Sequence, residues 1–220
     1  YVPDPKKIFS IEGNFQGIDM ASLEKTMKIG LSALEGTGKA RVALTGSGEN
    51  SKRFKETLNG EISLQVQNGR LHKFLILSKI FSLLNLKVLN MSSKGMSYDS
   101  ITANVVINNG IVRTNSFLLD SNSFRMTGVG EIDLGKSKID MVLGVQPFQT
   151  LDKVISNIPV IGKVLTGKKK SLIVSYYSVK GDLKNPVIKA KPVESVGKGV
   201  LGILKRVITL PKDLITGGEK

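Results

Sequence analysis

The chain has 220 residues, with 32 basic and 18 acidic side chains and no cysteine. This length is enough to bury a hydrophobic core, and the lack of cysteine excludes disulfides, zinc–thiolate sites and thiol nucleophiles. The formal net charge of +14 is unevenly placed, because residues 151–220 hold 14 of the basic and only 5 of the acidic side chains. This basic end indicates an anionic partner, either nucleic acid or an anionic lipid surface.

Aromatic residues are scarce in the basic part of the chain. Trp is absent, and residues 151–220 contain only Tyr176 and Tyr177 as aromatics, whereas nucleic-acid binders interleave positive charge with base-stacking rings. We therefore expect no nucleic-acid partner. No run reaches the ~18 uninterrupted apolar residues that a membrane-spanning helix needs, and no signal peptide is visible. Because the chain opens at Tyr1, we expect a fragment or processed product whose parent protein carries its anchor elsewhere.

The first part of the chain mixes two hydrophobic periods. Apolar residues at every second position predict strands, and apolar residues at helical spacing predict amphipathic helices. Asp19 is a suitable helix cap, and Asn68-Gly69 is a typical turn pair. In chain order, the expected elements are a strand at 8–17, a helix near 19–30, a strand at 41–46, a short polar helix or loop at 51–58, a strand at 60–68 and a helix near 73–89.

The strand pattern resumes after the second helix and continues with few interruptions. Residues 110–147 contain three alternating runs joined by turn residues, which predicts a β-meander with one apolar face. Asn185-Pro186 closes a further hairpin. The expected elements are a strand at 101–107, the meander, a broken and loosely helical segment near 150–165, strands at 172–179 and 187–190, and a helix at 195–208.

These elements predict a mainly β protein with some α (α+β), built on a long curved antiparallel sheet. The predicted helices are too few to cover the apolar face of about eight or more strands, so the uncovered part is expected to form an apolar groove that suits acyl chains. We expect a β-groove domain over 1–194 and a basic tail over 195–220. Parity alone gives the groove candidates: Ile62, Leu64, Val66, Ile101, Val105, Ile107, Phe124, Met126, Ile132, Leu134, Ile139, Met141, Leu143, Val145, Leu172 and Val174.

The sequence offers little for catalysis. His72 is the only histidine and has no recognisable nucleophile near it, so it is better explained as a polar residue at a helix start. The glycine clusters lack the spacing of phosphate-binding or dinucleotide-binding loops. The acidic residues lie scattered on the wet faces of predicted strands, without the spacing of metal ligands or paired acids. We therefore expect no enzyme, no cofactor and no metal site.

The helix expected at 195–208 leaves two alternatives open. Its apolar stripe and basic flank suit a helix lying in a membrane interface. The same stripe would also suit a helix that packs onto the end of the sheet. For the membrane alternative, the docking candidates are Lys198, Val200, Ile203, Leu204, Lys205, Arg206, Val207 and Ile208.

Five stretches of the chain are informative when they are taken together: LHKFLILSKIFSLLNL, the segment from Tyr98-Asp99 to Gly110, GVGEIDLGKSKIDMVLGVQP, NIPVIGKVLTGKKKSLIVSYYSVKGDLKNP and the closing VGKGVLGILKRVITLP. In this order they resemble the AsmA-like family, in the branch that includes YhdP and is related to TamB. The resemblance covers about residues 10–215. It implies a fragment of a periplasm-spanning bridge, anchored in the inner membrane of a diderm bacterium, whose β-groove conducts phospholipid to the outer membrane.

The resemblance and the apolar groove favour a lipid-transfer module of the periplasm or cell envelope. Its expected partners are phospholipids, a membrane surface and envelope proteins. The alternative is a structural envelope protein that assists outer-membrane protein assembly or envelope integrity by strand addition at an open sheet edge.

Overall fold

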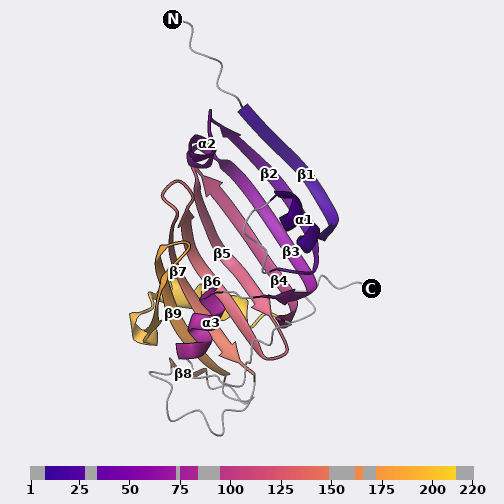
Figure 1. Ribbon diagram of the computed structural model, residues 1–220. Coiled ribbons are helices and arrows are strands. Elements are labelled where there is room, and N and C mark those ends of the chain that lie inside the picture. The colour runs from indigo at the N-terminus through magenta and orange to yellow at the C-terminus, as the bar shows by residue number, and fades with distance from the viewer. Residues whose placement is uncertain are drawn as a thin grey trace, which may run out of the picture.

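The computed structural model describes residues 8–27, 34–72, 75–83, 95–148, 162–165 and 172–211. Its main feature is an open, curved, ten-stranded sheet whose paired strands are all antiparallel (Figure 1). The strands follow the order β1-β2-β3-β4-β5-β6-β7-β9-β10, and β8 pairs with β9 off this path. Neighbours in sequence are therefore mostly neighbours in space, as short hairpin connections require. The mainly β, antiparallel fold expected from the sequence is confirmed.

The strands are longer than the alternation alone indicated, because pairing continues past the apolar positions. Their bounds are β1 Ile8–Asp19, β2 Thr37–Ser47, β3 Asn59–Leu71, β4 Met96–Asn108, β5 Ile111–Asp120, β6 Phe124–Asp133, β7 Lys138–Pro147, β8 Gly162–Leu165, β9 Leu172–Asp182 and β10 Val187–Lys191. The helices are α1 Met20–Met27, α2 Ser51–Thr57, α3 Leu75–Leu83 and α4 Lys198–Ile208, with a 3-10 turn, η2, at Val193–Ser195.

Two local predictions are wrong. Asn68-Gly69 is not a turn: Asn68 takes φ 52 and the strand continues, with Gly69 opposite Tyr98. Glycine is needed there because a Cβ would lie 1.9 Å from the Glu35 carbonyl oxygen. The loosely helical segment expected at 150–165 ends in a strand, since 162–165 form β8 on the edge of β9. The rest of that segment lies outside the described residues.

The two faces of the sheet differ in character. Residues directly opposite each other on paired strands share a face, and the register therefore links Val66, Ile101, Leu119, Met126 and Val145 across five strands. We call this side the apolar face. On the other side, the register links Asn14, Arg41, Ser63 and Asn104 from β1 to β4. We call that side the polar face.

Short helices cover the apolar face at its two ends. Met20 of α1 and Ile80 of α3 are buried in one cluster with Val66 and Val145. At the opposite end of β2, the ring of Phe54 in α2 lies against Gly46 and makes an edge contact with Phe9, with the ring centroids 5.7 Å apart. The described helices thus leave the middle of the apolar face without a helix over it.

Helix α4 packs on the polar face, over β5, β6 and β7. Leu204 and Ile208 are buried against Val174 and Tyr176, with Val129 and Val142 beside them. Of the two alternatives for this helix, the structure shows packing against the sheet. The apolar stripe that was a candidate for entering a membrane is already in contact with protein, because α4 shields this part of the polar face from solvent.

A buried arginine holds the carboxyl end of α4. The guanidinium of Arg125 forms a fork with Asp120, at 3.1 Å from Nε to Oδ1 and 3.0 Å from Nη2 to Oδ2. Its Nη1 donates to the carbonyl oxygens of Ile208 at 2.9 Å and Leu210 at 2.8 Å. The Ile208 carbonyl is among the groups that a helix end leaves without an intrahelical donor, and Leu210 lies two residues beyond that end. Arg125 therefore fixes where the chain leaves α4.

Candidate functional site

Most of the groove candidates lie on the apolar face. The register places there every candidate from β3, β4, β6 and β7, because each is opposite another member of the same side. The strand alternation therefore identified one face correctly across most of the sheet. These residues are Ile62, Leu64, Val66, Ile101, Val105, Ile107, Phe124, Met126, Ile132, Ile139, Met141, Leu143 and Val145.

The groove candidates differ in how deeply their side chains are buried. One group is buried in the protein core: Val66, Ile101, Ile107, Phe124, Met126, Ile139, Leu143 and Val145. A second group is only half-buried: Ile62, Leu64, Val105, Ile132 and Met141. The buried group already has protein neighbours, so the half-buried group is the one that a ligand could contact.

The half-buried residues form a continuous line across the sheet. The register runs from Val42 through Ile62 and Val105 to Thr114, Gly130 and Met141, from β2 to β7. We call this line the central row. Its side chains are apolar except for Thr114, and none is fully buried. The central row is therefore an apolar strip that the described helices leave accessible.

The apolar face continues onto the edge strand β1. Phe9, Ile11 and Phe15 are 54%, 48% and 40% exposed, and they lie opposite Gly46, Leu44 and Ala40 of β2. They were absent from the groove candidates although their alternation was visible in the sequence. Their exposure extends the accessible apolar surface to the open edge of the sheet.

Three candidates are placed differently. Val174 is on the polar face, because Val145 lies opposite Ser175, and it is buried under α4. Leu172 has the same parity in β9 as Val174, and its side chain lies outside the described residues. Leu134 follows β6 in the turn, where its amide donates to the Gly110 carbonyl at 3.0 Å. The prediction for Val174 is wrong because both faces of β9 are buried, which removes the distinction on which parity depends.

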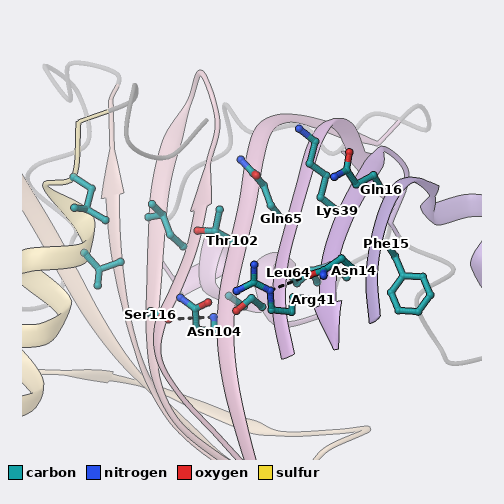
Figure 2. A pocket seen from close by; sticks show the side chains of 16 residues that line it. Asn14, Phe15, Gln16, Lys39, Arg41, Leu64, Gln65, Thr102, Asn104 and Ser116 are labelled. Atoms are coloured by element: carbon teal, nitrogen blue, oxygen red, sulfur yellow. Dashed lines mark hydrogen bonds between the residues drawn. The ribbon is translucent and has the colours of Figure 1, made fainter. Parts of the chain in front are cut away.

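The polar face carries two open pockets, which we call the first and the second hollow. Each has a volume of ≈ 550 Å³. The first is lined mainly by polar side chains of β1 to β5, and Figure 2 shows Phe15 turned away from them. The second is lined by Glu61, Val106, Arg113 and Glu131, among others. The curved sheet is confirmed, whereas an apolar groove is not outlined by the described residues.

The basic docking candidates of α4 point to solvent to different degrees. Lys198 and Arg206 are exposed and Lys205 is half-buried. Among the apolar candidates, Leu204, Val207 and Ile208 are buried, and Val200 and Ile203 pack partly against the same clusters. The charged side of α4 is therefore the part of the helix that is most exposed to a partner.

The histidine and the buried tyrosines take part in contacts that hold the fold together. His72 Nε2 lies 2.8 Å from Glu35 Oε1, and the hydroxyl of Tyr98 donates to the Glu35 carbonyl oxygen. Burial, and then the charge of Glu35, raise the pKa of Tyr98 to about 12. Burial likewise raises the pKa of Tyr177. These phenols stay protonated at neutral pH, and no group of three or more potential metal ligands occurs in the described part of the chain.

The described residues form an open, curved antiparallel sheet with one apolar face and helices at the ends of that face. A family model described as YhdP protein matches residues 6–188. The chain therefore belongs to the YhdP family, which confirms the resemblance and implies a cell-envelope protein with, at most, an AsmA-like lipid-transport role. Members of this family are not known enzymes. The match ends before α4.

Searches of curated proteins and of solved structures each found no match. None of the helices that the structure describes is long and apolar enough to cross a membrane.

Proposed function

We propose that this chain is a lipid-binding and transfer module that moves phospholipid between the inner and outer membranes of a diderm cell envelope. Acyl chains lie on the apolar face, and the headgroups stay in water at its margin. The observation that carries the proposal is the central row: Val42, Ile62, Val105 and Met141 are apolar and half-buried, and the helices that the structure describes on this face lie at its ends. Each methylene removed from water contributes about 0.8 kcal/mol, so even partial burial of two acyl chains stabilises a complex.

Copurification of lipid tests this function. We expect native mass spectrometry of the purified chain to show adducts with the masses of phospholipids, and solvent extraction to release the same species. The adducts should disappear in a detergent that competes for the apolar face. A chain that stays folded and lipid-free after incubation with phospholipid vesicles would contradict the proposal.

A second candidate function is strand addition at the edge of β1. The two sheet edges differ: β10 has only five residues, carries Lys189 and Lys191 and lies between two prolines, which are features that block edge pairing. In contrast, β1 has twelve residues and exposes Phe9, Ile11 and Phe15. An extended segment of an envelope protein could pair with this edge.

Proline substitution in β1 distinguishes the two functions. Successive amides of a strand point to opposite sides. Of the neighbouring variants Glu12→Pro and Gly13→Pro, one therefore removes a hydrogen bond to β2 and the other, the edge variant, removes a donor at the free edge. The variant that loses a hydrogen bond to β2 is expected to lower the midpoint of thermal unfolding by several degrees, whereas the edge variant should leave the midpoint nearly unchanged. Loss of envelope function in the edge variant with lipid adducts retained would favour strand addition. Full function in that variant would count against it.

A further inference from the structure

The first hollow on the polar face has a one-sided charge. Sixteen residues line it, and none of them is acidic. Two are cations, Lys39 and Arg41, and neither forms an ion pair within the described part of the chain. The other polar members offer amides and hydroxyls: Asn14, Gln16, Ser63, Gln65, Thr102, Asn104 and Ser116.

The two cations are placed to act on the same ligand. Lys39 and Arg41 are alternate residues of β2, so they share the polar face with backbone positions about 6.6 Å apart. Gln65 lies opposite Lys39, and Ser63 lies opposite Arg41. Figure 2 shows Lys39, Arg41 and Gln65 standing on the same side of the sheet. Both long side chains can therefore reach a group a few ångströms across.

The guanidinium of Arg41 is oriented by its neighbour on β1. Its Nε donates to Asn14 Oδ1 at 2.9 Å, a bond drawn in Figure 2. With Nε engaged, the terminal nitrogens are the donors that remain for a ligand. A planar guanidinium presents such donors in a fork that matches two oxygens of a phosphate group, and an ammonium adds a point charge beside it.

The second hollow provides a contrast on the same face and with the same volume. Its cation, Arg113, is bonded to Glu131 at 3.0 Å, and Glu61 also lines the hollow. Two carboxylates against one guanidinium do not favour an anion. The positive character of the first hollow is therefore a local property of that hollow and not of the whole basic chain.

The rim of the first hollow adds an apolar element. Leu118 of β5, Val207 of α4 and Leu210 complete the lining on the side of the helix. Strands β2 and β5 are three strand spacings apart, roughly 14 Å, so the organic part of a ligand held by Arg41 and Lys39 would reach these side chains only by extending across β3 and β4. This arrangement suits a phosphate group that carries an extended organic part, such as the glycerol and acyl chains of a phospholipid.

We propose that the first hollow is a phosphate-binding site, in which Arg41 and Lys39 hold the phosphate oxygens and the surrounding amides and hydroxyls complete the shell. The phosphate comes either from a free phosphate compound or from a phospholipid headgroup. The inference goes beyond the proposed function and does not depend on it, because the hollow and the central row lie on opposite faces of the sheet.

The test is a titration of the folded chain, followed by amide NMR shifts, at constant ionic strength. One arm uses inorganic phosphate and the other uses dihexanoyl phosphatidylglycerol below its micelle concentration. We expect shifts centred on β2 and β3 around Lys39, Arg41 and Gln65. Arg41→Gln should weaken binding at least about tenfold, as loss of a charged hydrogen-bond donor implies.

The matched control is Arg113→Gln, which removes the same charge from the second hollow and should leave the affinity unchanged. Equal affinity in the two arms would support a site for the phosphate group alone, and tighter binding of the lipid would support a headgroup site that uses the apolar rim. The proposal is overturned if Arg41→Gln titrates like the wild type, or if Arg113→Gln weakens binding equally, since the shifts would then report only general attraction to a basic protein.

Discussion

Replacement of Arg125 by Met is expected to destabilise the protein by about 3–5 kcal/mol, the usual cost of removing one partner of a buried ion pair. The side chains of Arg125 and Asp120 are 9% and 2% exposed. The variant takes the guanidinium away from Asp120 and from the carbonyls of Ile208 and Leu210. Because these contacts join α4 to β6, α4 should also become easier to detach.

The matched variant is Arg113→Met. Arg113 and Glu131 form a second ion pair between β5 and β6 on the same face of the sheet, but their side chains are 53% and 49% exposed. Such a pair contributes about 0–1 kcal/mol. Urea unfolding followed by circular dichroism, with hydrogen exchange of the α4 amides, measures both changes. Similar losses for the two variants would show that burial does not set the value of the Arg125 contacts.

The strand alternation predicted the sheet well because most strands are apolar on one side only. Ile62, Val105 and Met141 were assigned to one face from parity, and the register places them in line. The sequence also indicated that the helices are few. Parity could not predict how deeply each side chain is buried, since Val66 and Ile62 alternate in the same way although only Val66 is fully buried. Depth depends on where α1, α2 and α3 come to lie, which is a tertiary property.

The failures have a common physical cause, namely contacts from distant segments. Val174 was assigned to the wrong face because α4 buries the side of β9 that would otherwise be exposed to solvent. Gly69 looked like part of a turn because its sequence neighbours cannot show that the Glu35 backbone passes close to it. The link from Arg125 to α4 spans more than eighty positions along the chain. The polar hollow likewise combines residues of β1 to β5 and α4, and no local pattern marks it.

Introduction of a charge into the central row is expected to have the largest effect on lipid binding. Val105 is half-buried on the apolar face, between Ile62 and Thr114 of the neighbouring strands. In Val105→Asp, an acyl chain at this point would meet a carboxylate, and an unpaired charge in an apolar contact costs several kcal/mol. We therefore expect at least a tenfold decrease in copurified phospholipid and in the rate of transfer between vesicles.

Val106 provides the control because it is the same residue type in the same strand, but it is 50% exposed on the polar face. Val106→Asp adds the same charge and should leave lipid binding and transfer close to those of the wild type. If Val105→Asp fails to fold, Val105→Thr adds a hydroxyl at nearly constant volume and should lower lipid binding by a smaller factor. Equal lipid binding by the Val105 and Val106 variants would show that acyl chains do not lie on the apolar face. A decrease confined to Val105 would show that lipid contacts the central row, because the two variants differ only in the face of the sheet that carries the charge.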